Sequence, residues 1–223
     1  MKQLRSSVKT PIIAVITAGS NVNVAAIESY ADAIIYAWYP GEQGGNALAD
    51  ILLGNVSPSG RLPITFYKSV ADLPDYNNYA MKGRTYRYYD GSVQYPFGFG
   101  LSYASFDYKI ASNPKMNYVE KDTISVQVNI TNNGKMDAAE LVQAYIEYPS
   151  LERMPLKELK YFKRIEIKKG QSNKVFVNIP VRELKKWNLQ KSTWDLYPGK
   201  YKLIFGANAQ QKIVSIPFEI TTK

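Results

Sequence analysis

The pattern that most constrains this chain is the strict alternation of apolar and polar residues in its second half. Apolar residues alternate with polar ones from Ile124 to Ile130, and Asn132-Asn133-Gly134 supplies a turn directly afterwards. Successive side chains of a strand point to opposite faces, so the alternation predicts a strand with one buried face. Further strand-like segments follow at 141–148, 159–167, 174–179, 200–206 and 213–220. About seven short strands in this length are typical of an all-β immunoglobulin or fibronectin III-like sandwich.

The first half has a different pattern, in which apolar residues run continuously. The segments 12–16 and 33–38 are uninterrupted apolar runs, and such runs suit parallel strands that are buried on both faces. Short helices are expected at 24–30 and 47–53, and an edge strand at 62–66. Because sheets usually have about 4–6 strands, this region is too small for a whole domain. We expect an incomplete α/β parallel-sheet sandwich, completed by the rest of a longer chain or by another chain.

An aromatic-rich segment separates the two regions. Tyr and Phe make up a third of residues 76–108, against 13% aromatic residues in the whole chain. This composition predicts a bridge across a domain interface, where tyrosine rings bury area while their hydroxyls stay hydrogen-bonded. The alternative is that the arginines and tyrosines of the bridge stack on sugars or bases. The chain is thus divided into residues 1–75, 76–105 and 106–223.

The composition excludes several kinds of chemistry. The 223 residues include no His and no Cys, which excludes a Ser-His-Asp triad, a thiolate nucleophile and His- or Cys-ligated metals. No apolar run approaches the roughly 18 residues of a membrane span. The polar start and the short apolar run at 11–18 do not fit a signal peptide. Catalysis by such a chain would have to use carboxylates, Lys, Tyr or backbone dipoles.

The net charge of +9 raises the alternative of a nucleic-acid-binding module. Residues 111–223 carry 19 Lys and Arg against 11 Asp and Glu, so the excess belongs to the second half. The densest basic patch consists of Lys157, Lys160, Lys163, Arg164, Lys168 and Lys169. Glu158 and Glu166 interrupt it, and strand alternation explains it as a solvated face. We therefore expect no nucleic-acid partner.

Four motifs, in collinear order, strongly resemble the family 3 glycoside hydrolases. They are Ala37-Trp38-Tyr39-Pro40-Gly41-Glu42-Gln43-Gly44-Gly45-Asn46-Ala47-Leu48-Ala49-Asp50-Ile51-Leu52, Gly54-Asn55-Val56-Ser57-Pro58-Ser59-Gly60-Arg61-Leu62-Pro63, Lys82-Gly83-Arg84-Thr85-Tyr86-Arg87-Tyr88 and Tyr95-Pro96-Phe97-Gly98-Phe99-Gly100-Leu101-Ser102-Tyr103. The second half resembles the fibronectin III-like domain of that family through segments 132–134, 140–145, 157–164 and 199–201, together with Trp194. The third motif is most similar to the β-xylosidase and β-glucosidase branch.

The resemblance implies a parent enzyme larger than this chain. Such enzymes have a (β/α)8 barrel with the nucleophilic Asp, then an α/β sandwich with the acid/base Glu, then the fibronectin-like domain. The chain resembles only the end of that sandwich, the bridge and the last domain, so no catalytic residue is assigned here. The implied parent activity is retaining removal of terminal β-linked xylosyl or glucosyl units from oligosaccharides, by a periplasmic or secreted enzyme without a cofactor or metal. The chain alone is expected to be inactive and to have a structural, interdomain role.

Four residues are candidates for a position near the substrate or between the domains: Trp38, Arg84, Tyr86 and Arg87. The resemblance suggests that some of the last three approach the barrel pocket in a complete enzyme. The other reading is a stand-alone β-sandwich that binds carbohydrate or a protein partner. Such a face should show clustered exposed aromatics, for which Trp187 and Trp194 are candidates, although we expect Trp194 to belong to the core.

Acidic residues and glycines near the first motif invite catalytic or phosphate-binding interpretations. Glu42 lies beside a helix start, which stabilises a carboxylate and makes it a poor proton donor, so we expect a structural or capping role. Glu28 and Asp32 have the spacing of a shared, solvated helix face. The segment 40–45 follows a strand and precedes a helix, but it matches neither common phosphate-binding motif. It is expected to be a tight strand-to-helix turn.

Overall fold

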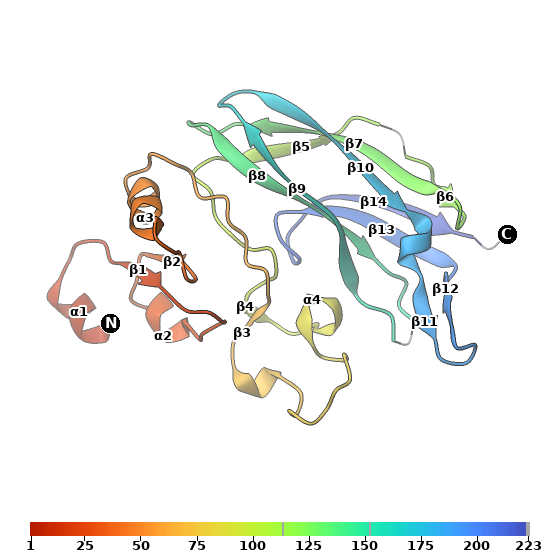
Figure 1. Cartoon of the computed structure of the whole chain (residues 1–223), viewed down its shortest axis with the longest axis horizontal. Helices are drawn as coiled ribbons and strands as arrows, with labels where there is room; N and C mark the ends of the chain where they lie inside the picture. The colour runs from red at the N-terminus through yellow and green to blue at the C-terminus, as the bar shows by residue number, and fades with distance from the viewer. Residues whose placement is uncertain (113, 152, 222–223) are drawn as a thin grey trace.

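The computed structural model describes residues 1–112, 114–151 and 153–221. A small α/β part and a larger β-sandwich are joined by a long segment with little regular structure (Figure 1). None of the described helices combines the length and the apolar character needed to cross a membrane.

The first part is built around two parallel strands. Its elements are α1 (Lys2–Ser7), β1 (Ile13–Ile16), α2 (Ala25–Glu28), β2 (Ala33–Tyr36) and α3 (Gly44–Leu52). Ile13 lies opposite Ala33 and Ile16 opposite Tyr36, so the expected parallel pairing is confirmed. The expectation that these strands are buried on both faces is wrong, because Ile13 and Val15 of β1 are 47% and 43% exposed. In the described structure no further strand pairs with these two, and one face of β1 is left to solvent.

The connecting segment contains β3 (Phe66–Tyr67), the 3-10 turn η1 (Val70–Asp72), α4 (Thr85–Tyr88) and β4 (Val93–Tyr95). β3 pairs with β4. The prediction of a strand over 62–66 is wrong, because of these residues only Phe66 lies in a strand. Leu62 instead exchanges two backbone hydrogen bonds with the bridge, to Phe99 and from Gly98, both at 2.8 Å. Pro63 has no N–H with which to continue a ladder, so this pairing stops after one residue.

The second part is a sandwich of two sheets. Its elements are β5 (Phe106–Ile110), β6 (Asn117–Tyr118), β7 (Thr123–Asn132), β8 (Ala138–Glu147), β9 (Lys157–Ile167), β10 (Ser172–Pro180), η2 (Val181–Leu184), β11 (Lys186–Asn188), β12 (Thr193–Asp195), β13 (Gly199–Gly206) and β14 (Lys212–Ile220). One sheet has the order β10-β7-β5 and the other β6-β14-β13-β8-β9, while β11 and β12 form a separate hairpin. The predicted fibronectin-like sandwich is confirmed. The apolar residues from Ile124 to Ile130 are each at most 2% exposed and face the other sheet.

The hydrophobic core lies almost wholly in the sandwich. Of the fully buried apolar side chains described, only Val24 and Phe66 precede residue 106. Burial of apolar surface is the main driving force of folding. The sandwich therefore supplies most of the folding energy, and the first part depends on what is packed against it.

Candidate functional site at the junction of the two parts

Three of the four predicted site residues lie at α4, and the structure places Trp38 elsewhere. Trp38 follows β2 in a left-handed backbone conformation, with φ of 53°, and its half-buried ring packs on Tyr36 at 4.8 Å. Arg84, Tyr86 and Arg87 lie just before or within α4, which is packed against β9. The helix therefore brings three candidates to the junction, each with a different set of partners.

Arg84 holds the loop that precedes it. Its Nε donates to the carbonyl of Ala80 at 3.2 Å, and its Nη2 donates to the carbonyls of Asp75 at 3.1 Å and Asn78 at 2.6 Å. The guanidinium thus replaces the regular hydrogen bonds that residues 75–80 lack.

Tyr86 joins the bridge to the sandwich. Its ring stacks on Phe97 at 4.3 Å and meets Tyr145 edge-on at 5.9 Å. Its hydroxyl accepts a hydrogen bond from the N–H of Leu159 on β9 at 3.1 Å. Burial raises the pKa of this tyrosine above its usual value, so the hydroxyl stays protonated. The ring and the hydroxyl of Tyr86 are thus both used in contacts between the bridge and the sandwich.

Arg87 forms a buried charge cluster with Glu158, which we call the Glu158 clamp. Arg87 pairs with Oε1 of Glu158, while the hydroxyl of Tyr148 donates to Oε2 at 2.7 Å. Lys160 and Lys186 also pair with Oε2. Burial disfavours the charged form of Glu158, but these donors outweigh it and lower the pKa of its carboxyl to about 2. Glu158 is therefore an anion at neutral pH, and it links α4 to β9 and β11.

The pKa of Glu158 has a consequence for stability at low pH. A depressed folded-state pKa stabilises the native state above the unfolded-state value of 4.5, and this stabilisation is lost as the pH falls towards about 2. We expect the melting temperature to fall between about pH 4.5 and pH 2, and Glu158→Gln to flatten that fall. Melting curves of both proteins across this range test it, and equal acid slopes would contradict it.

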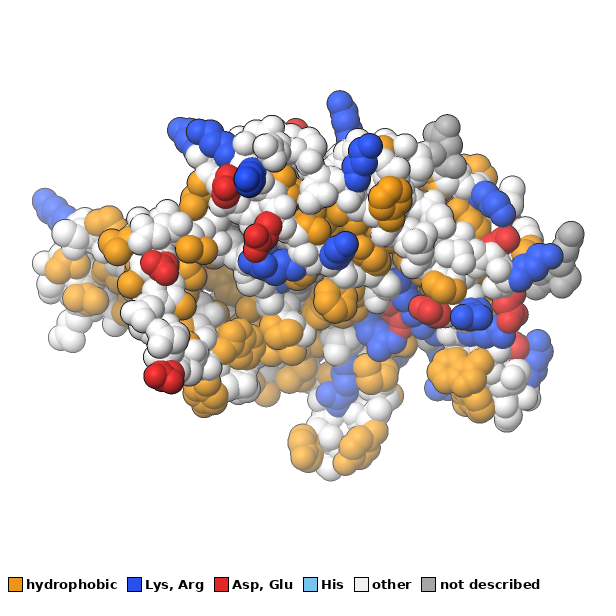
Figure 2. Space-filling model, turned by 45° about the horizontal axis from the view of Figure 1, so that its top comes forward, with side chains coloured by type: hydrophobic (Ala, Val, Ile, Leu, Met, Phe, Trp, Pro, Cys, Tyr) orange, Lys and Arg blue, Asp and Glu red, His pale blue; other side chains and the backbone are white. Residues whose placement is uncertain are grey.

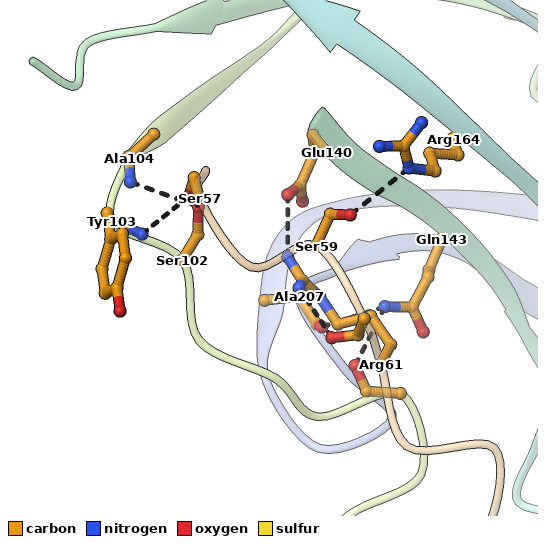
Figure 3. Close-up of polar contacts among 12 residues, drawn as sticks. Ser57, Ser59, Arg61, Ser102, Tyr103, Ala104, Glu140, Gln143, Arg164 and Ala207 are labelled. Carbon is orange, nitrogen blue, oxygen red and sulfur yellow. Dashed lines mark hydrogen bonds and ion pairs between the residues drawn. The ribbon is translucent and has the colours of Figure 1, made fainter. Parts of the chain in front are cut away.

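A second buried ion pair, the Glu140 clamp, joins the loop after α3 to β8. Nη2 of Arg61 lies 2.9 Å from Oε2 of Glu140, and the hydroxyl of Tyr108 donates to Oε1 at 2.8 Å. Figure 3 shows Arg61 reaching from its loop to Glu140, beside the contact of Ser59 with Arg164. The two side chains of the ion pair are 6% and 5% exposed. Burial raises the pKa of Glu140, with Arg61 and Tyr108 opposing the shift.

Gly98 shows how closely the bridge approaches the sandwich. Its φ is +81°, and a Cβ at this position would lie 2.1 Å from Oε1 of Gln143 and 2.9 Å from the hydroxyl of Tyr145. Nε2 of Gln143 donates to the carbonyls of Gly98 at 3.2 Å and Ala207 at 3.0 Å. Only glycine meets both the conformation and the space, which explains its place in the Pro96-Phe97-Gly98-Phe99-Gly100 motif.

A small cleft of about 220 Å³ lies beside α4. Its lining includes Thr65, Tyr86, Asp90, Lys157 and Gln210. Asp90 is the one carboxylate in this lining. Among the described residues, no group of three or more Asp and Glu side chains is placed to hold a metal ion. The dominant chemistry of the junction is thus the pairing of arginines from the first part and bridge with carboxylates of the sandwich.

Sequence reasoning missed Glu140 and gave Glu158 the wrong environment. Glu158 and Glu140 are 4% and 3% exposed, so the interpretation of Glu158 as part of a solvated basic face is wrong. The available signal was a charged residue within the otherwise mostly apolar strand 138–146. A charge in such a strand is buried only when it is paired, and the arginine partner of each glutamate lies more than 70 residues away.

The acidic residues of the first part have other roles than those expected. Glu28 and Asp32 do not share a helix face, because α2 ends at Glu28. Glu28 accepts a hydrogen bond from the hydroxyl of Tyr95 at 3.0 Å, whereas Asp32 binds Arg5 and the N–H of Ile12. Glu42 is exposed and does not cap α3, since Gln43 holds the N-cap position. The expected tight turn is confirmed by Gly41, whose φ is +70°.

The expected core position of Trp194 is also wrong. Its side chain is 59% exposed and packs against Trp187, which is 48% exposed. The hairpin is oriented by Lys186, which points inward to Glu158, so that its tryptophans lie on the other face.

Comparison with known proteins identifies the chain. Residues 2–103 match the family profile "Glycosyl hydrolase family 3 C-terminal domain", and residues 140–209 match "Fibronectin type III-like domain". The chain belongs to glycoside hydrolase family 3. It represents a C-terminal part of that family, as the resemblance of its motifs predicted.

Two curated relatives and one solved structure illustrate the match. The chain is 37% identical to "Xylan 1,4-beta-xylosidase" of Xylanibacter ruminicola, with 95% of this chain and 24% of that protein aligned. It is also 37% identical to "Periplasmic beta-glucosidase" of Salmonella typhimurium, with 89% and 28% aligned. A GH3 beta-glucosidase structure from Bifidobacterium adolescentis superposes with a TM-score of 0.86 at 31% identity, over 98% of this chain and 34% of that one. The family 3 chain thus spans about a quarter to a third of the length of these relatives.

Proposed function

We propose that this family 3 chain is the C-terminal portion of a retaining, exo-acting β-glycosidase that removes terminal β-linked xylosyl or glucosyl residues. Within that enzyme its task is to fasten the end of the α/β sandwich to the fibronectin-like domain. The observation that carries this role is the pair of clamps, in which Arg61 and Arg87 reach buried glutamates of one sheet from two separate segments. The relatives named as a xylosidase and a glucosidase support the two substrate classes.

The proposal places the nucleophilic Asp and the acid/base Glu in parts of the parent enzyme that this chain does not match. A retaining glycosidase needs two carboxyl groups about 5–5.5 Å apart, one of which must donate a proton. The lowered pKa of Glu158 suits a structural anion rather than a proton donor. Glu140 is 3% exposed and both of its oxygens are bonded, to Arg61 and Tyr108, so it does not present a carboxyl group to a substrate. The exposed apolar face of β1 is where the remaining α/β sandwich, and through it a (β/α)8 barrel, would pack.

The contacts at α4 favour the interdomain role over substrate binding for three of the candidates. Arg84 donates to loop carbonyls, Tyr86 contacts Leu159 and Phe97, and Arg87 pairs with Glu158. In the proposed enzyme these residues fix the bridge. Trp38, half-buried beside Tyr36, would support the end of the first part.

The proposal is tested by activity. We expect the purified 223-residue chain to release no p-nitrophenol from p-nitrophenyl β-xyloside or β-glucoside. The complete enzyme, produced from the reading frame that contains this segment, should hydrolyse at least one of them with retention of configuration. Hydrolysis that copurifies with the isolated chain and rises in proportion to it would overturn the structural role, and an inactive complete enzyme would overturn the glycosidase assignment.

A further inference from the structure

The hairpin of β11 and β12 presents its two tryptophans to solvent. Trp187 lies directly opposite Trp194, and their rings meet edge-to-face with centroids 5.8 Å apart. Figure 2 shows hydrophobic side chains gathered beside charged ones at the end of the molecule where Figure 1 places this hairpin. Two large indoles in water are unfavourable, so their exposure requires a physical reason.

The reason lies on the opposite face of the hairpin. Lys186 points inward, pairs with Glu158 of the clamp and lies 4.8 Å from the ring centroid of Tyr148. Because neighbouring side chains of a strand point to opposite faces, this anchor forces Trp187 outward. The cross-strand register then places Trp194 beside it. The orientation of both indoles is thus fixed by buried contacts and does not depend on a flexible loop.

The turn of the hairpin is also held in one shape. Oδ1 of Asn188 accepts hydrogen bonds from the N–H groups of Gln190 at 3.0 Å and Lys191 at 3.2 Å. Nδ2 of Asn188 donates to Asp195 at 2.9 Å, and Lys191 pairs with Asp195 at 2.9 Å. A ligand that binds here meets a preformed surface, so little conformational entropy is lost on binding.

The charges around the indoles are balanced. Lys186 is paired with Glu158, Lys191 with Asp195, and Lys185 with Glu120 at 2.6 Å. A polyanion would find few free cations at the hairpin, although the chain as a whole is basic. The balanced charges instead favour a neutral ligand, which would contact the indole face itself.

The exposed area of the two tryptophans favours a glycan over a protein partner. The exposed portions of two indoles amount to on the order of 250 Å², far below the roughly 800 Å² per partner of a stable protein interface. The C–H face of a pyranose ring matches one indole face, and the tilt of 74° between the rings allows two successive sugars of a chain to make contact.

We propose that Trp187 and Trp194 form a binding site for a neutral β-linked glycan chain. The class of ligand rests on the proposed function, whereas the existence of the site rests on the geometry of the hairpin. The site would hold a polymer or oligosaccharide by stacking and carries out no chemistry.

Affinity gel electrophoresis of the 223-residue chain tests this site, with soluble xylan or mixed-linkage β-glucan in the gel. We expect at least one glycan to retard the wild-type chain, and Trp187→Ala or Trp194→Ala to raise the apparent dissociation constant at least tenfold. Phe176→Ala is the matched control, since Phe176 on β10 is 62% exposed but stands apart from the hairpin, and it should leave retardation unchanged. Melting curves confirm that each variant is folded, and Trp194→Phe should keep part of the affinity.

Several outcomes overturn the site. These are no retardation of the wild-type chain in either glycan, retardation that persists in the Trp187→Ala/Trp194→Ala variant, and self-association by light scattering that Trp194→Ala abolishes. The last result would make the hairpin a contact between copies. Since binding is measured without turnover, a complete enzyme that is inactive while the isolated chain still binds glycan would refute the proposed function alone.

Discussion

Replacing Glu140 with alanine is expected to lower the free energy of unfolding by about 3–5 kcal/mol, because the change leaves a buried arginine without its partner. The side chains of Arg61 and Glu140 are 6% and 5% exposed, so water cannot replace the lost charge as it does at the surface. The hydroxyl of Tyr108 loses its acceptor as well, and an unsatisfied buried donor adds to the cost. Urea unfolding of the variant and the wild-type chain measures the difference. The comparison requires that the free energy of unfolding depends on urea concentration with the same slope in both proteins.

Two further variants separate the ion pair from general damage to the fold. Glu166 pairs with Arg164 at 3.2 Å, but both side chains are more than half exposed, so Glu166→Ala should change stability by no more than about 0.5 kcal/mol. The double variant Arg61→Met/Glu140→Met replaces both charges with apolar side chains and should recover much of the loss. A double variant as unstable as the sum of the single ones would show that the two residues act independently.

Glu158→Ala is expected to have an effect of similar size, about 3–5 kcal/mol, for a different reason. Arg87, Lys160 and Lys186 converge on this carboxylate, and Tyr148 donates to it. Without it, three cations repel one another beside an unpaired hydroxyl. Because Arg87 is 39% exposed and the two lysines less than 20%, the lysines are the costlier groups to leave unpaired.

Glu147 provides the matched control for this cluster. It also binds two lysines, Lys202 at 2.6 Å and Lys212 at 2.8 Å, but both are nearly half exposed. Glu147→Ala should therefore cost about 1 kcal/mol or less. Equal losses for Glu147→Ala and Glu158→Ala in urea unfolding would mean that burial does not govern the strength of the clamp.

The two clamps also explain why the first part stays attached to the sandwich. The described first part has almost no buried apolar side chains of its own, so hydrophobic packing alone gives it little stability. Directed ion pairs and the close approach at Gly98 fix the bridge where a continuous core is absent. Breaking either clamp should thus loosen residues 60–100 before it unfolds the sandwich.

The local features of the chain followed from the order of its residues. Alternation from Ile124 to Ile130 predicted a strand of the sandwich, and continuous runs at 12–16 and 33–38 predicted a parallel pair. Both rest on the geometry of the extended backbone, which needs no information from distant residues. The motifs from Trp38 to Tyr103 also indicated the family correctly, since each retains its residue types in order.

The environment of individual side chains was decided by the tertiary structure. The 61–140 and 87–158 pairs join residues more than 70 positions apart, so no local pattern reveals which arginine pairs with each glutamate. Trp194 illustrates the same limit, because a tryptophan in a strand predicts the core. Its exposure follows from Lys186, which the carboxylate of Glu158 draws inward from the neighbouring strand. Sequence alone determined the parallel pair, the long strands of the sandwich and the family, but not the segment 62–66. Long-range charge pairing decided which face of the hairpin meets solvent.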